Sequence, residues 1–421
     1  MVHPAHGHRA LLFSVLSFAA VAGCDGLGDR KNDASQADWK VDDDALRTDA
    51  PAVGLSPLDG QPLFHDSTPI HVDADHVPPD AGSGLAATDA DNAEASSNTD
   101  TDTTPPLADA GQAPETTMPS TYTVVVLPDT QYYASTYPDV FTSQTSWIVE
   151  QKAALNIAAV LHVGDIVDDP NSAAQWTIAN SAMRQLDHLV PYVVVPGNHD
   201  TDGSRNGLID SYFGPASMPW ITSTMNPGQI ENNFALIDIG PQQWLVLGLE
   251  FGPRDTVITW ANAVLKAYPD RPAIIVTHAY LYSDGNRYDI AVSGSDTTQP
   301  NYQYWIPQYY GYTASQGIND GEMIWQKLIV PNPNVRMVFS GHVTGWARSS
   351  STRPDGSVVH QMLSDYQWYR TDQPDYYGGG GYLRVVKFNY GQRTIQVQSY
   401  SPYLDKYLTD DANQFSLEMQ P

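Results

Sequence analysis

The chain has 421 residues, with 48 acidic and 21 basic side chains that give a net charge of −27. This charge argues against sequence-independent binding to nucleic acid, because the phosphates would repel so acidic a protein. The single cysteine, Cys24, excludes an intrachain disulfide, and the length allows two or three domains.

The N-terminus has the features of a signal peptide. Arg9 precedes an apolar segment, residues 10–20, which is too short to span a bilayer but has the length of a signal-peptide core. The sequence Val-Ala-Gly-Cys follows, and its cysteine, Cys24, stands where a bacterial lipobox would have one. This resemblance predicts a lipoprotein signal peptide at residues 1–23. The alternative is an ordinary signal peptide followed by an incidental cysteine.

The lipobox resemblance implies lipidation of Cys24. Such a cysteine becomes the first residue of the mature chain and carries two or three acyl chains, which are enough for stable membrane attachment. We therefore expect a lipid-anchored protein of the bacterial cell envelope that faces the periplasm or the cell exterior.

Residues 24–118 form an acidic segment rich in Asp, Ala, Pro and Thr. Residues 25–120 hold 20 acidic side chains against 4 basic ones and very few aromatic residues. No helical or strand period persists, so the segment cannot bury enough apolar surface to offset its loss of conformational entropy. We predict a disordered, extended tether between the anchor and a domain at residues 119–421.

From residue 121 the pattern changes to short apolar runs that alternate with helical periodicity. Strands are predicted at residues 122–127, 157–163 and 192–195, and helices between them at residues 143–155 and 173–189. Strands and helices that alternate at these lengths are typical of parallel βαβ units. This half of the domain is therefore predicted to contain a parallel sheet.

The remaining chain is predicted to supply a second sheet. Further strands are expected at residues 233–239, 244–249, 273–277 and 335–340, and helices at residues 256–267 and 319–330. Three late apolar runs, at residues 358–363, 382–388 and 394–400, predict a closing antiparallel meander. We expect one α/β domain in which two sheets pack face to face.

Polar side chains follow five of the predicted strands, at the point where each strand ends. They are Asp129, Asp165, Asn198 with His199, His278, and His342. In open α/β sheets, ligands bind beyond the carboxyl ends of the strands. Carboxylate, amide and imidazole groups without sulfur suit Mn, Fe or Zn rather than a structural thiolate zinc site. The five strand ends together therefore predict a metal centre.

These residues lie in blocks that resemble those of the calcineurin-like metallophosphoesterase superfamily, over about residues 121–402. The blocks of that family are Asp-x-His, Gly-Asp-x-x-Asp, Gly-Asn-His-Asp/Glu, a lone His and Gly-His-x-His. Here they begin at Asp129, Gly164, Gly197, His278 and Gly341, and the second and third are intact. The resemblance implies a four-layer α/β/β/α sandwich that hydrolyses phosphomonoesters or phosphodiesters with a metal-activated water.

The resemblance also implies the metal ligands. One position would be held by residues that are all present, namely Asp165, Asn198, His278 and His342. The other would use Asp129, Asp165 as a bridge, and two imidazoles, but this sequence has Gln131 and Thr344 in the imidazole places. Because an amide carbonyl and a hydroxyl are weaker ligands, this position should bind transition metals less tightly and should not favour iron. The expected cofactor is one or two divalent ions of Mn, Zn or Fe.

For catalysis, the resemblance implies that His199 contacts the phosphate or protonates the leaving oxygen, and that Asp200 orients it. The alternative is that His199 merely packs the loop. Asp168 is interpreted as a supporting residue or helix cap, and His162 as a core histidine. Substrate contacts are predicted for Asn198, His199 and Arg348.

The substrate is predicted only as a small phosphoester or a nucleotide. Aromatic residues in the segment 301–312 could stack a base, a sugar or an aryl group, or could simply cover the edge of a sheet. The incomplete second metal position leaves an alternative function open. In that case the domain would be a metal-binding surface or adhesin module with weakened or absent catalysis.

Overall fold

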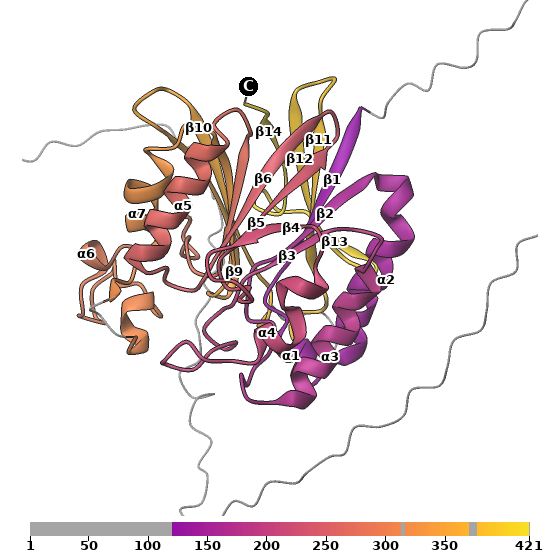
Figure 1. Cartoon of the computed structure of the whole chain (residues 1–421), viewed down its shortest axis with the longest axis horizontal. Coiled ribbons are helices and arrows are strands. Elements are labelled where there is room, and N and C mark those ends of the chain that lie inside the picture. Colours follow the sequence, from indigo (N-terminus) through magenta and orange to yellow (C-terminus); the bar gives the residue numbers. More distant parts are fainter. Residues whose placement is uncertain (1–119, 313–315, 370–376, 421) are drawn as a thin grey trace, which may run out of the picture. The chain divides into compact units, whose positions relative to one another are not determined.

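The computed structural model describes residues 120–312, 316–369 and 377–420 of the chain. The predicted signal peptide, the lipidation site at Cys24 and the predicted tether lie outside the described residues. Within the described part, the strands form two seven-stranded sheets (Figure 1). The prediction of an α/β fold with two sheets is therefore confirmed.

The first sheet is built around β1 (Thr121–Leu127), which runs parallel to β2 (Ile157–His162). β3 (Tyr192–Val194) continues the parallel part, and β1 pairs antiparallel with β11 on its other side. The other strands of this sheet are C-terminal: β11 (Leu383–Asn389), β12 (Thr394–Ser401), β13 (Lys406–Leu408) and β14 (Gln414–Glu418). The first sheet thus joins the two ends of the domain.

Four neighbouring strands of the second sheet are parallel. They are β6 (Gln242–Leu249), β7 (Ala273–Thr277), β8 (Val335–Ser340) and β10 (Val358–Asp365). Three antiparallel strands complete the sheet, namely β4 (Ile221–Thr224), β5 (Asn233–Ile239) and β9 (Gly345–Thr352). Of the predicted three-strand closing meander, only the antiparallel pairing of β11 with β12 is confirmed. β10 belongs to the second sheet, because an apolar run by itself does not specify its pairing partner.

The α-helices lie between the strands in chain order. They are α1 (Gln131–Ser135), α2 (Pro138–Leu155), α3 (Ala173–Met183), α4 (Ile209–Phe213), α5 (Asp255–Ala267), α6 (Ile290–Ser293) and α7 (Gly321–Ile324). A π-helical turn, Trp325–Ile329, continues α7, and short 3-10 turns lie at Arg184–Leu186, Pro215–Ser217 and Pro307–Tyr310. None of the described helices is both long and apolar enough to cross a membrane.

The side chains of β1 alternate between two hydrophobic clusters. Val124 and Val126 face the second sheet, where they pack in one cluster with residues of β6 and β7. Val125 and Leu127 face the opposite way and pack with residues of α2 and α3. A third cluster lies between the second sheet and α5, and Figure 1 shows α5 and α2 far apart, with the sheets between them. Burial of both faces explains the continuous apolar runs of the sequence.

Candidate metal centre

The loop after β2 places Asp165 in contact with the loop after β3. Gly164 and Asp165 both have positive φ values, 103° and 49°, which turn the chain sharply at the end of the strand. Asp165 is buried, and its Oδ1 accepts a hydrogen bond from the backbone N–H of His199 at 2.9 Å. A Cβ at Gly197 would lie 2.0 Å from the same oxygen, so this close approach requires glycine.

His278 turns its Nε2 toward two oxygen atoms. Its Nδ1 donates to the carbonyl oxygen of Val163 at 2.9 Å, so the neutral ring has its lone pair on Nε2. Asp165 Oδ2 and Asn198 Oδ1 each lie 3.2 Å from this Nε2. Burial acts to lower the pKa of His278, but the charge and hydrogen bond of Asp165 outweigh it and raise the pKa. Three acceptor atoms that converge in this way are stabilised by a proton or by a metal cation.

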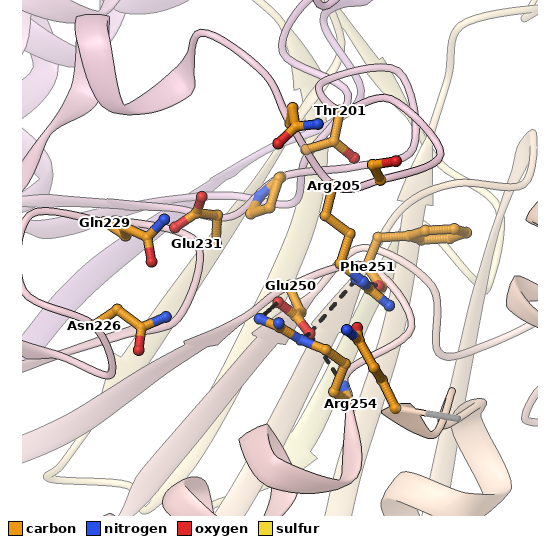
Figure 2. A pocket seen from close by; sticks show the side chains of 12 residues that line it. Thr201, Arg205, Asn226, Gln229, Glu231, Glu250, Phe251 and Arg254 are labelled. Atoms are coloured by element: carbon orange, nitrogen blue, oxygen red, sulfur yellow. Dashed lines mark hydrogen bonds and ion pairs between the residues drawn. The ribbon is translucent and has the colours of Figure 1, made fainter. Parts of the chain in front are cut away.

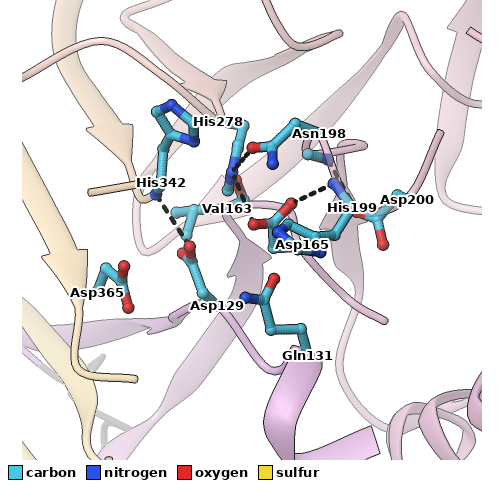
Figure 3. A network of polar contacts seen from close by, with 12 residues as sticks. Asp129, Gln131, Val163, Asp165, Asn198, His199, Asp200, His278, His342 and Asp365 are labelled. Atoms are coloured by element: carbon cyan, nitrogen blue, oxygen red, sulfur yellow. Dashed lines mark hydrogen bonds and ion pairs between the residues drawn. The ribbon is translucent and has the colours of Figure 1, made fainter. Parts of the chain in front are cut away.

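His342 completes the group from the loop after β8. Its Nε2 donates to the carbonyl oxygen of Trp305 at 2.7 Å, and its Nδ1 is buried without a hydrogen-bond partner in the described part of the chain. Burial, with the nearby charge of His278, lowers the pKa of His342 to about 3, which leaves the Nδ1 lone pair free. Ligand atoms of Asp165, His278 and His342 lie within 4.8 Å of one another (Figure 3). We call these three residues and Asn198 the nitrogen group.

Asp129 and Gln131 lie next to the nitrogen group. Asp129 Oδ2 accepts a hydrogen bond from the backbone N–H of His342 at 3.0 Å, whereas its Oδ1 has no partner among the described residues. Gln131 begins α1, a helix that the sequence did not predict, and its Nε2 donates to Gln367 Oε1 at 2.7 Å. Burial, followed by the charges of Asp365 and Asp165, raises the pKa of Asp129 well above its usual value.

Asp365 is a residue of this site that the sequence analysis missed. It ends β10, is fully buried, and accepts the backbone N–H of Gln367 at 2.9 Å through Oδ1. Burial is the main cause that raises its pKa to about 7. An acidic residue that ends an apolar strand was a usable signal, but the strand was predicted to stop at Leu363. We call Asp129, Gln131 and Asp365 the oxygen group.

The prediction that Asp200 orients His199 is wrong. Asp200 is buried and accepts backbone N–H groups from Ile166, Val167 and Gly197, at 2.8, 3.0 and 2.8 Å. Its side chain therefore links the loop after β2 to the loop after β3 by hydrogen bonds. Asp200 therefore shapes the turn that carries Asp165.

Asp168 takes the role that was assigned to Asp200. The Nδ1 of His199 donates to the backbone oxygen of Asp168 at 3.0 Å, and the Asp168 carboxylate lies 3.4 Å away. Burial opposes protonation of His199, but the bonds to Asp168 and the charge of Asp165 outweigh it and raise the pKa to about 10. The structure thus holds a partly exposed, cationic imidazole beside the nitrogen group.

Two further predicted residues lie outside the metal centre. His162 is a core histidine, as predicted: it is fully buried, its Nδ1 accepts the N–H of Gly164, and its Nε2 bonds to Thr130 Oγ1 at 2.9 Å. Arg348 is exposed on β9 with its guanidinium 4.4 Å from the ring centre of Phe415. Its predicted contact with substrate phosphate is corrected, because β9 turns this side chain toward β14.

Aromatic residues of the segment 301–312 pack around the centre. The carbonyl oxygen of Trp305 binds His342, and the ring of Tyr310 lies 5.6 Å from that imidazole. Tyr304 and Trp305 nevertheless remain about half exposed, at 47% and 48%. This segment therefore both supports the centre and offers aromatic surface to solvent.

A polar pocket of about 210 Å³ lies behind Phe251 (Figure 2). Phe251 lines this pocket, and the centre of its ring lies 5.0 Å from that of His342. Two arginines line the pocket and both approach Glu250: Arg254 through a bidentate pair at 2.7 and 2.8 Å, and Arg205 at 3.5 Å. This pocket therefore contains positively charged, negatively charged and neutral polar side chains near the centre.

Comparison with known proteins gives one family and one curated relative. A family model for calcineurin-like phosphoesterases matches residues 122–344. The uncharacterized protein YvnB of Bacillus subtilis is 36% identical over an alignment of 321 residues that covers 71% of this chain and 22% of YvnB. The chain thus spans only about a fifth of the length of this relative.

Two solved structures illustrate the structural neighbours. The purple acid phosphatase PPD1 from yellow lupin (Lupinus luteus) seeds has 16% sequence identity and a TM-score of 0.44, covering 71% of this chain and 54% of its own. GAP50, the anchor in the inner membrane complex of Plasmodium, has 11% identity and a TM-score of 0.40, covering 72% of this chain and 90% of its own.

Proposed function

The chain belongs to the calcineurin-like phosphoesterase family, and from this premise we propose that it is a metal-dependent phosphoester hydrolase that acts outside the cytoplasm. One observation carries the proposal. Buried ligand atoms of Asp165, His278 and His342 lie within 4.8 Å of one another, and a backbone carbonyl binds the other ring nitrogen of each imidazole.

The residues of the nitrogen group fit a divalent metal ion. Asp165, Asn198, His278 and His342 would hold it through two oxygens and two nitrogens, a ligand set that suits Mn, Zn or Fe. A metal ion there supplies Lewis-acid polarisation of a phosphoryl oxygen and a bound water of lowered pKa. The glycine at position 197 and the anchoring of the loop by Asp200 keep Asp165 in place for this task.

His199 is proposed to act on the leaving group. Its Nδ1 is held by Asp168, so Nε2 is the nitrogen available to substrate, and the side chain is 38% exposed. With a pKa raised to about 10, the ring stays protonated at neutral pH. It can therefore donate a hydrogen bond to a phosphate oxygen and a proton to the departing oxygen.

The finer features of the proposal rest on several observations. Three hydrophobic clusters that separate helices, sheet, sheet and helices support the four-layer α/β/β/α sandwich. The lipobox-like sequence at Cys24 supports a lipid anchor in the cell envelope. The small polar pocket and the acidic chain favour a small phosphoester or nucleotide over nucleic acid as the substrate.

Hydrolysis assays on the purified full-length protein test the proposal. With Mn²⁺ or Zn²⁺ it should hydrolyse generic phosphomonoester or phosphodiester reporters, and Asp165→Ala or His342→Ala should reduce the rate at least about a thousandfold. Circular dichroism and elemental analysis establish that each variant is folded and how much metal it binds. Folded wild-type protein that is inactive with every divalent metal would overturn the proposal; a bound metal without turnover would instead favour the surface or adhesin module.

A further inference from the structure

The polar pocket of Figure 2 adjoins the metal centre. Two of its lining residues, Pro196 and Thr201, stand on either side of His199 in the chain. A third, Phe251, has its ring centre 5.0 Å from that of His342. When the phosphoryl group of a substrate lies at the nitrogen group, the pocket is therefore a place that the rest of the substrate can occupy.

One wall of the pocket is held in place by hydrogen bonds. In this loop, Asp202 Oδ1 accepts the backbone N–H groups of Ser204 and Asn206, both at 2.8 Å. Arg205 donates to two backbone oxygens of the segment after β6, at 2.6 and 2.8 Å, and its guanidinium lies 4.3 Å from the ring centre of Tyr312. Because this wall is already ordered, a ligand that binds against it loses little free energy to ordering the loop.

The two arginines of the pocket are already engaged with an acidic partner. Arg254 forms a bidentate ion pair with Glu250 at 2.7 and 2.8 Å, and Arg205 Nη1 lies 3.5 Å from the same carboxylate. Burial raises the pKa of Glu231, the other acidic lining residue, to about 7, so that about half of these carboxyl groups are uncharged at neutral pH. Among the described lining residues, no unpaired cation therefore awaits an anionic group, and the pocket suits an uncharged one.

The rim of the pocket carries exposed side chains that both donate and accept hydrogen bonds. These residues are Ser204, Asn206, Asn226, Gln229 and Gln316. A hydroxyl group on a ligand also donates and accepts, so a hydroxyl-rich group can bind several of them at once. The volume of about 210 Å³ is smaller than the roughly 300–1,000 Å³ of a pocket that encloses a drug-sized ligand, which indicates a group the size of a single ring.

We propose that the pocket binds an uncharged, hydroxyl-rich part of the substrate, such as a sugar ring, while the phosphoryl group lies at the nitrogen group. This inference rests on the proposed function and names its substrate class. Among the hydrogen bonds of the described residues, Asn226 and Gln229 use only backbone atoms. Both amide side chains are therefore available to a ligand, and Figure 2 shows them across the pocket from Phe251. We assign Asn226 and Gln229 as the residues that determine specificity for the sugar.

A matched pair of substrates tests the proposal. The full-length protein with Mn²⁺ is assayed on glucose 6-phosphate and on cyclohexylmethyl phosphate, which has a six-membered ring on the same linkage but no hydroxyl groups. The para-nitrophenyl diester of each compound is assayed in the same way. Since two or three hydrogen bonds between neutral groups correspond to about 10–100-fold in affinity, we expect kcat/KM to be at least about tenfold higher for the sugar ester, mainly through a lower KM.

The other outcomes separate this inference from the proposed function. Equal kcat/KM values for the two esters, or hydrolysis of generic reporters but of neither ester, would overturn the inference and leave the proposed function standing. Folded protein that hydrolyses no phosphoester would overturn both. Glucosamine 6-phosphate, in which an ammonium group replaces one hydroxyl, should be a poorer substrate than glucose 6-phosphate. A preference for glucosamine 6-phosphate would show that the pocket selects a cation, and would also overturn the inference.

Variants of the rim test the two assigned residues. Asn226→Ala combined with Gln229→Ala should raise the KM for glucose 6-phosphate about tenfold and bring the ratio of the two kcat/KM values closer to one. The control Gln392→Ala removes an exposed amide in the turn between β11 and β12 and should keep the wild-type ratio. Circular dichroism establishes that each variant is folded. A wild-type KM and ratio in the double variant would contradict the assignment of Asn226 and Gln229.

Discussion

The nitrogen group and the oxygen group lie side by side at the same strand ends, yet their free atoms arise differently. In the nitrogen group, carbonyl oxygens of Val163 and Trp305 bind one nitrogen of each imidazole, so that only the other nitrogen can face a metal ion. In the oxygen group, the bonds to Asp129, Gln131 and Asp365 leave one oxygen of each side chain free. Backbone carbonyls thus determine which atoms stay free in the nitrogen group. Backbone N–H groups and the side chain of Gln367 determine this in the oxygen group.

This difference has an electrostatic consequence. His342 can remain neutral when no metal is bound, because its pKa is lowered to about 3. Burial is the main cause that raises the pKa of Asp129 and of Asp365, and the negative charge of Asp165 raises both further. The strand ends therefore place imidazole nitrogens in one group and only carboxyl and amide oxygens in the other, which differ in chemical hardness.

The largest expected effect comes from a variant that should impair catalysis and leave the metal ligands of both groups unchanged. His199→Ala should lower kcat by about a thousandfold, because it removes the proposed proton donor. His199 contributes only its backbone N–H to Asp165, and alanine retains that group. Bound metal, measured by elemental analysis, should therefore stay at the wild-type amount. Reduced metal content in this variant would show that His199 supports the nitrogen group instead.

A smaller effect is expected from loosening the nitrogen group alone. Asp200→Ala leaves three buried backbone N–H groups without their acceptor and should lower the free energy of unfolding by about 3 kcal/mol. Chemical denaturation of the metal-free protein measures this change. Asp411→Asn serves as the exposed control and should stay within about 0.5 kcal/mol of the wild type. An equally small change for Asp200→Ala would contradict its role as the anchor of the loop.

The smallest expected effect comes from a double variant that gives the oxygen group imidazole ligands like those of the nitrogen group. Gln131→His combined with Thr344→His would add two imidazoles and should tighten Zn²⁺ binding at the oxygen group about tenfold relative to Mn²⁺. Competitive titration with a chromophoric chelator measures both affinities. A Zn²⁺ to Mn²⁺ preference equal to that of the wild type would mean that these side chains do not face a bound metal ion.

Much of the site could be predicted because its signals are local. Asp129, Asp165, Asn198, His278 and His342 each lie a few positions beyond the end of a buried strand, and strand ends can be recognised from short apolar runs. Asp365 escaped because its strand was assigned to a meander, and its parallel pairing with β8 depends on segments remote in sequence. The contact with the His199 ring was predicted for Asp200, but Asp168 makes it. Adjacent loop residues, here His199 and Asp200, can point in opposite directions, which a motif does not specify.

The sequence by itself determined which ligand types stand at the strand ends, since strand formation and the residue after it are encoded within a few positions. Only the tertiary structure decided which atoms of those residues remain free. The hydrogen bond between His278 and Val163 spans 115 positions, that between His342 and Asp129 spans 213, and that between Gln131 and Gln367 spans 236. Such partners meet only when both sheets have formed, and they determine which lone pairs can bind a metal.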